Sequence, residues 1–301
     1  FRSAKVRVLN WMGHHFEAQK MLDKVPDSMR NDREILEDRL YAARWGGNPA
    51  EAVNVSKRLE STFADNQQIR TLTRDTRLAF GNSLQGGFRY VSDSDGLIDR
   101  TRSGEFGIHL TPGQQLHAGY SFRDFLLTTP LSLRRYELGW SGVVTRRIGS
   151  YATASEVDYD RTGIHKIIGD GGLSVIMNDS SRLILGGGTI AMDAFNAIAH
   201  SVTGPFFSGE LVLTPAYRSR IDVRYAQYRF SDGVRRDRSD LEGLQQVTSN
   251  PYAKIRFGWR SNLMWHDRGT DDFYSPASFM AHMMVAQSYG KIARSLDYFA
   301  E

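Results

Sequence analysis

Two different spacings of apolar residues divide the chain. In the first 66 residues glycine is rare, and apolar residues recur at three- and four-residue intervals, as Leu36 and Leu40 do. This spacing predicts amphipathic helices. After about residue 75 glycine becomes frequent and apolar and polar residues alternate, which predicts β-strands. The sequence therefore predicts a helical segment at 1–66, a linker at 67–75 and a β-rich segment at 76–301.

The helical segment contains two similar stretches. Gly13 and Ala18 in the first stretch correspond to Gly47 and Ala52 in the second, at an offset of about 34 residues that equals the tetratricopeptide period. A glycine permits the turn after a helix, and an alanine lets a second helix approach closely. We therefore expect these four residues to support the packing of tetratricopeptide-type repeats. An unrelated pair of helical hairpins is the alternative.

The β-rich segment predicts about 13 antiparallel strands. Its clearest alternation, over Ala253–Trp265, places apolar and aromatic side chains on one face and basic or polar ones on the other. The first face would hold Ile255, Phe257, Trp259, Leu263 and Trp265, and the second Lys254, Arg256, Arg260, Asn262 and His266. After Tyr225 the apolar positions shift by one residue, which predicts a β-bulge.

Alternation leaves two kinds of β-structure open, a water-soluble sandwich and a membrane barrel. Several alternating segments exceed nine residues, which is long enough for a tilted strand to cross a bilayer. Charges of both signs on the polar positions suit a water-filled interior, and aromatic residues recur near the strand ends. We therefore expect an α + β multidomain fold, with tetratricopeptide-type repeats followed by an antiparallel transmembrane β-barrel. A soluble β-sandwich adaptor remains the alternative.

The amino-acid composition excludes some catalytic and metal-binding functions. The chain has 301 residues, no cysteine and a formal net charge of +4, so thiol catalysis and cysteine-ligated metals are excluded. The eight histidines are scattered, and the cluster from Asp93 to Gly96 suits a turn better than a calcium loop. We expect no metal, no cofactor, no nucleic-acid partner and no enzymatic activity. A lipase- or deacylase-type enzyme is the rival hypothesis, and it requires a serine and a histidine in hydrogen-bond contact.

Three stretches carry a family resemblance. They are Phe88–Leu97, Tyr228–Arg236 and Phe273–Phe279, and they follow the helical segment in that order. The combination resembles bacterial exopolysaccharide exporters of the poly-N-acetylglucosamine export porin and cellulose synthase operon protein C type. The resemblance implies an outer-membrane porin that passively exports an exopolysaccharide, with its repeats in the periplasm. It implies outer-membrane lipid and periplasmic polysaccharide-modifying or synthase components as partners.

A lumen for a hydrated polymer needs polar side chains that exchange many weak contacts. We expect the charged strand residues to line it, although a merely solvated face is the alternative for each of them. The chain begins at Phe1 and ends within an expected strand, so we expect a fragment whose export signal lies outside it. The predicted lumen residues are Lys254, Arg256, Arg260, His266, Glu156, Asp158, Asp160, Arg220, Asp222 and Arg224.

Overall fold

A computed structural model describes residues 3–92, 98–126, 130–160, 163–192, 194–216, 218–248, 253–272, 275–293 and 296–300. The turn from Asp93 to Gly96 lies outside these residues. None of the described helices is long and apolar enough to span a membrane. The chain divides into two compact units, Phe1–Asp179 and Ser180–Glu301, and each is described by itself.

The first unit begins with five helices, and side-chain caps define where some of them start. Asn48 accepts a hydrogen bond from the backbone N–H of Glu51 at 3.3 Å, with Pro49 at the first helical position. Asn66 caps the next helix in the same way. The helices are α1 (Ser3–Met12), α2 (His15–Leu22), α3 (Arg33–Trp45), α4 (Pro49–Thr62) and α5 (Gln67–Ala79), with a 3₁₀ turn at Asp27–Met29.

The helices bury two small apolar clusters. Ala18 is fully buried beside Leu22, in a cluster to which α1, α2 and α3 contribute. Ala52 is fully buried beside Leu59, in a cluster shared by α3, α4 and α5. Gly13 and Gly47 have φ angles of 87° and 73°, which a residue with a Cβ adopts only with strain. The four residues therefore lie at turns and close helix contacts.

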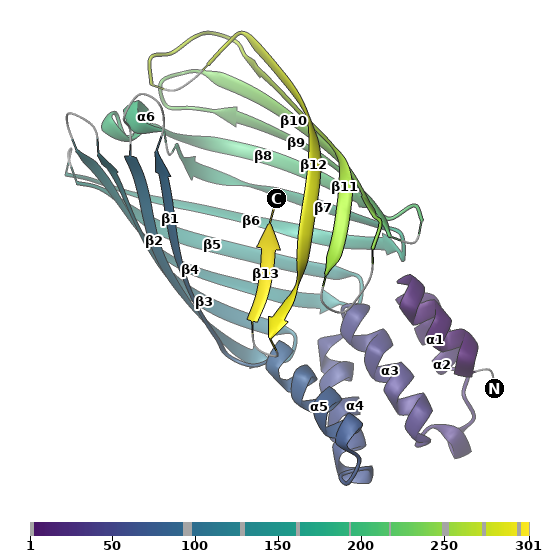
Figure 1. Ribbon diagram of the computed structural model, residues 1–301. Coiled ribbons are helices and arrows are strands. Elements are labelled where there is room, and N and C mark those ends of the chain that lie inside the picture. The colour runs from purple at the N-terminus through teal and green to yellow at the C-terminus, as the bar shows by residue number, and fades with distance from the viewer. Residues whose placement is uncertain are drawn as a thin grey trace. The chain divides into compact units, whose positions relative to one another are not determined.

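The six strands of the first unit follow one another in an antiparallel meander (Figure 1). Their register is continuous apart from irregularities near the turn after β2 and the turn after β4. The strands are β1 (Ser83–Ser92), β2 (Ile98–Thr111), β3 (Gln114–Leu126), β4 (Leu131–Thr145), β5 (Ile148–Tyr159) and β6 (Ile164–Asn178).

Within this unit the helices are attached to the turns at one end of the strands. The carboxylate of Asp179, directly after β6, accepts hydrogen bonds from the backbone N–H groups of Phe16 at 2.8 Å and Glu17 at 3.2 Å. Arg146, in the turn between β4 and β5, lies 3.6 Å from the carboxylate of Glu51 in α4. Both acids lie near a helix N-terminus, where the helix dipole favours negative charge.

The second unit is also an antiparallel meander (Figure 1). A buried cluster of Met192, Ala197, Val202, Phe230 and Val234 packs around a short helix. The elements are β7 (Ser181–Ala191), α6 (Phe195–Ala199), β8 (Thr203–Leu213), β9 (Ser219–Arg229), β10 (Arg235–Gln246), β11 (Lys254–His266), β12 (Ser278–Ala293) and β13 (Leu296–Ala300).

The expected fold class, tetratricopeptide-type repeats followed by a transmembrane β-barrel, is wrong. The described residues are mostly a large antiparallel sheet with few helices, and no extended helical repeat region precedes it. Two helix pairs are fewer than the roughly three repeats that such a stack needs, so the repeated glycine and alanine mark local helix packing. The predicted linker at 67–75 lies inside α5 instead, because Asn66 caps a helix that buries Ile69 and Leu72. The predicted large antiparallel sheet is confirmed.

Candidate functional site

The sheet of the first unit has two chemically different faces. Directly paired residues of antiparallel strands point to the same side, so the register assigns each residue to a face. One face, here called the first apolar face, carries large side chains that are exposed, such as Leu138 at 62 %. Its exposed members include Leu84, Phe88, Tyr90, Phe106, Ile108, Leu116, Tyr120, Tyr136, Leu138, Ile167 and Leu173.

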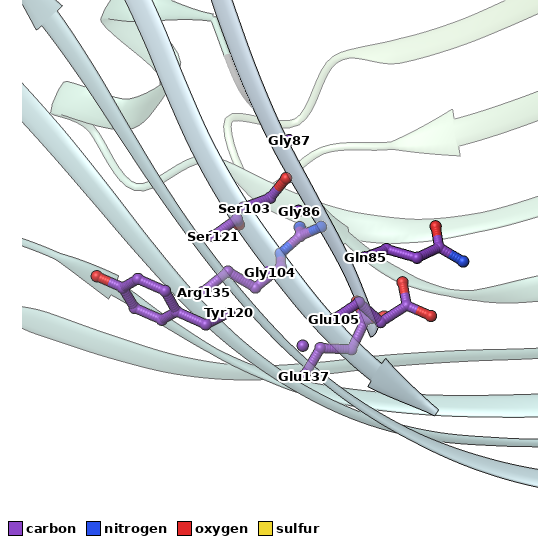
Figure 2. A pocket seen from close by; sticks show the side chains of 11 residues that line it. Gln85, Gly86, Gly87, Ser103, Gly104, Glu105, Tyr120, Ser121, Arg135 and Glu137 are labelled. Atoms are coloured by element: carbon purple, nitrogen blue, oxygen red, sulfur yellow. The ribbon is translucent and has the colours of Figure 1, made fainter. Parts of the chain in front are cut away.

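The opposite side, here called the first polar face, contains a hollow of about 330 Å³ over β1–β4. Gly87 and Gly119 lie on this face and add no side chain, which leaves the space open. Figure 2 shows the polar side chains around the hollow and Tyr120 pointing away from them. The polar side chains are Gln85, Ser103, Glu105, Ser121, Arg135 and Glu137.

The hollow presents donors and acceptors side by side. Glu137 is held from two directions, by Nε2 of His117 at 3.5 Å and by the hydroxyl of Ser155, which donates at 3.3 Å. Nε of Arg135 is buried and has no hydrogen-bond partner among the described residues. The Arg135 guanidinium lines the hollow and presents a positive charge to an acceptor group of a ligand. Hydroxyl groups of a ligand would meet both a cation and carboxylates here.

Sequence analysis missed this hollow because no single strand contains it. Its polar residues come from four strands, and they become neighbours only through the register that pairs Glu105 with Gly119 and Gly119 with Glu137. The available signal was the recurrence of glycine among polar residues, as at Gly86, Gly87 and Gly119.

The three predicted lumen acids of β5 and the turn after it do not line the first polar face. Glu156 pairs with Tyr136, and Asp158 pairs with Arg134, which places both acids on the first apolar face near one end of the strands. There they form ion pairs: Arg134 lies 3.9 Å from Asp158 and 3.3 Å from Asp160. His165 of β6 approaches Glu156 and Asp158 at 3.6 and 3.8 Å. We call Arg134, Glu156, Asp158, Asp160 and His165 the charged rim.

The acids of β5 lie on the first apolar face because apolar residues occupy the other side of the sheet at this end of the strands. Val157 and Tyr159, which alternate with the predicted lumen acids of β5, are fully buried on the first polar face, paired with Arg135 and Leu133. Apolar side chains thus fill part of the polar side. The alternation distinguished two sets of residues in β5, but it did not determine which set faced which way.

The second unit has a corresponding polar face, and seven predicted lumen residues lie on it. Register places Arg220, Asp222 and Arg224 of β9 on the same side as Lys254, Arg256, Arg260 and His266 of β11. This second polar face is rich in ion pairs. Arg220 donates to both carboxylate oxygens of Asp222, at 2.7 and 3.0 Å, which is a bidentate pair. The other pairs are Arg224 with Glu210, Arg238 with Asp240, and Arg260 with Glu242.

Two cations of this face have a different environment. The Nζ of Lys254 lies 5.5 Å and the guanidinium carbon of Arg256 lies 4.7 Å from the centre of the Tyr289 ring. The Tyr289 hydroxyl donates to the side-chain oxygen of Gln246 at 3.2 Å. His266, by contrast, is buried at the end of β11, and its Nδ1 lies 2.8 Å from the backbone oxygen of Pro276, which indicates a structural role.

The opposite side of the second unit, here called the second apolar face, is exposed. Phe257, Trp259 and Trp265 alternate along β11 as predicted, and their exposed fractions are 51 %, 37 % and 42 %. A soluble sandwich would cover these rings with a second sheet. Among the described elements of the second unit, none covers these rings.

A serine–histidine contact does occur, on the second apolar face. The hydroxyl of Ser261 and Nδ1 of His282 are 2.8 Å apart, but the other ring nitrogen of His282 approaches the sulfur of Met280 at 2.9 Å. A hydrolytic triad needs an acid or amide to orient the histidine. Within the described ranges neither such an acid nor a cluster of metal-binding side chains is found.

Comparison with known proteins gives a structural likeness. No protein-family model and no curated protein matches the chain. Its structure is similar to a solved structure described as a bacterial polysaccharide outer membrane secretin, with a TM-score of 0.62 and 19 % sequence identity. The match covers 72 % of this chain and 74 % of the other. At this level of identity the likeness shows a shared fold.

Proposed function

We propose that this protein is an outer-membrane component that carries polysaccharide along the polar faces of its antiparallel sheet. The observation that carries the proposal is the contrast between the faces. The apolar faces expose large aromatic and aliphatic side chains, whereas the polar faces hold ion pairs and the hollow. Exposed apolar surface of this extent marks a site of contact with lipid or another protein.

The charged rim favours lipid, rather than another protein, as the partner of the exposed apolar faces. Along β4 the first apolar face changes from the exposed Leu138 and Tyr136 to Arg134, which pairs with Asp158 and Asp160. A strand that crosses a bilayer changes in this way where it leaves the hydrocarbon, because charges are costly only inside it. The likeness to the polysaccharide secretin points to the same setting.

The polymer would move by exchanging weak contacts, without a cofactor and without a catalytic step. The family resemblance implies an exopolysaccharide such as poly-N-acetylglucosamine or a cellulose-like glucan. We further propose that the helices α1–α5 lie in the periplasm, near polysaccharide-modifying or synthase components.

Two arginine substitutions test the membrane assignment. Leu138→Arg places a cation in the middle of the first apolar face, and Ser121→Arg places one on the first polar face. On a lipid-facing site arginine costs about 2–4 kcal/mol near the bilayer midplane, whereas an exposed leucine in water tolerates it. We expect Leu138→Arg to reduce insertion into vesicles strongly and Ser121→Arg to insert normally. Equal insertion of both variants would refute the membrane assignment.

Transport is tested on vesicles that contain the whole chain and an entrapped fluorescent oligosaccharide. We expect efflux above that of protein-free vesicles, together with retention of an entrapped dextran too large to pass. Absence of oligosaccharide efflux from vesicles with correctly inserted protein would refute the transport function.

A further inference from the structure

The second polar face carries an excess of positive charge that its own acids do not neutralise. Each carboxylate on the strands β8–β10 of this face already contacts an arginine, as Asp222 contacts Arg220 and Glu242 contacts Arg260. Lys254 and Arg256 lie on the same face outside these pairs. The first polar face shows no such excess, because Arg89, Arg123, Arg135 and Lys166 are balanced there by Asp99, Glu105, Glu137 and Asp170.

Lys254 and Arg256 concentrate this excess at one place. They lie two residues apart on the same face of β11, which separates their Cα atoms by roughly 7 Å. Both cations lie near the Tyr289 ring, and neither has a carboxylate within 4 Å among the residues the structure describes. Attraction to the ring holds the two cations close to each other without neutralising them.

The neighbours of this pair can also bind hydroxyl groups. In the register Arg256 is flanked by Gln246 of β10 and Gln287 of β12. Gln246 accepts from the Tyr289 hydroxyl through its oxygen, which fixes its amide beside the cations. The cluster of Lys254, Arg256, Gln246 and Tyr289 therefore combines two positive charges with amide and phenol groups. We call it the cation cluster.

We infer that the polysaccharide handled by this protein is acidic, unlike the polymers that the family resemblance implies, and that the cation cluster binds its carboxylate groups. This inference rests on the proposed function and specifies its substrate class. A guanidinium pairs with a carboxylate through two parallel hydrogen bonds, and a nearby ammonium adds charge attraction. A neutral glucan would gain only hydroxyl contacts here, and a cationic amino-sugar polymer would be repelled.

The test measures binding of fluorescent oligosaccharides of equal length to the whole chain in a detergent without a sugar headgroup. The probes are an oligogalacturonate, a neutral malto-oligosaccharide and a cationic glucosamine oligomer. We expect the oligogalacturonate to bind best and its affinity to fall as salt is raised, because added salt screens charge attraction.

Two double variants separate the cation cluster from net charge. Lys254→Gln with Arg256→Gln removes the cluster, and Arg74→Gln with Arg77→Gln removes two exposed cations of helix α5 that are paired with acids. Losing two charged hydrogen-bond donors should weaken oligogalacturonate binding roughly 10- to 100-fold in the first variant. The second variant should change it far less. Circular dichroism of both variants verifies that the strands have folded, and the single Lys254→Gln variant replaces the double one if it does not fold.

The outcomes are distinct. Preference for the neutral or the cationic probe would refute the acidic polymer and leave the proposed function standing. Equal losses in the two double variants would refute the cation cluster as the binding site. Failure of every probe to bind would count against the proposed function itself.

Discussion

The attachment of helix α2 to the strand turns depends on one carboxylate, that of Asp179. It accepts from the backbone N–H groups of Phe16 and Glu17, the first free donors of the helix. Asp179→Ala removes both hydrogen bonds and the negative charge at the helix N-terminus. A lost cap costs about 0.5–2 kcal/mol, and a charge at this position is worth about 0.3–1 kcal/mol. We therefore expect local destabilisation of α2 by about 1–3 kcal/mol.

Hydrogen exchange measures this change directly. If α2 exchanges by local opening, a loss of 1–3 kcal/mol speeds the exchange of its amides by roughly 5- to 150-fold. The helices that do not contact Asp179, such as α4 and α5, should keep their exchange rates. Asp179→Asn, which retains an oxygen acceptor but no charge, should fall between the wild type and Asp179→Ala.

Asp65 supplies the matched control. Its side chain is fully exposed, and its nearest cation, Arg70, is 3.8 Å away. Asp65→Ala removes the same charge from the same unit without removing a helix cap, so it should leave α2 unchanged. If Asp179→Ala left the exchange of α2 unchanged, or if Asp65→Ala accelerated it equally, the attachment described above would be wrong.

Three further predictions concern the first unit. Ala18→Leu should overpack a fully buried site and lower the free energy of unfolding by about 1–3 kcal/mol in chemical denaturation, whereas Ala50→Leu on the exposed side of α4 should not. Burial lowers the pKa of His15 below its ordinary value of 6.5, so the unfolded chain binds the proton more readily than the folded chain. The free energy of unfolding should therefore fall as the pH drops below about 6.5. His15→Gln should make the melting temperature depend less on pH in this range. Gly119→Val should fill the hollow and slow oligosaccharide efflux with unchanged insertion into vesicles, because a Cβ there meets Glu137 at an ordinary contact distance of 3.6 Å.

Local features of the sequence predicted local features of the structure well. The alternation in β11 placed Phe257 and Trp259 opposite Lys254 and Arg256, and the register confirms it. Such a pattern is informative because a strand without a bulge has a strict period of two. The cap at Asn48 could likewise be identified from the residues that follow it.

Features that depend on pairing between strands could not be predicted in this way. In β9 the apolar shift after Tyr225 predicted a bulge, but the register with β8 and β10 is continuous, so the prediction is wrong. Tyr228 instead faces the polar side, where its ring lies 5.8 Å from that of Phe230 and 4.5 Å from the guanidinium of Arg236. An aromatic residue on a polar strand face has the same sequence signature as a change of register. Only the partner strands distinguish the two.

For the polysaccharide transport proposed above, the paired arginines of the second polar face suit a moving polymer better than a fixed ligand. Arg220 and Arg238 each contact an acid two residues along the same strand, Asp222 and Asp240, which holds the long side chain along the sheet surface. A guanidinium has five N–H donors, and a bidentate pair with a carboxylate uses two of them. The remaining donors can reach sugar hydroxyls, while the paired acid offers further acceptors. Because the charge is already neutralised, each such contact is weak, and a chain of sugars can leave one pair for the next without a deep energy minimum. The cation cluster differs in that its charge is not neutralised, so it would hold an acidic group longer than any of the paired sites.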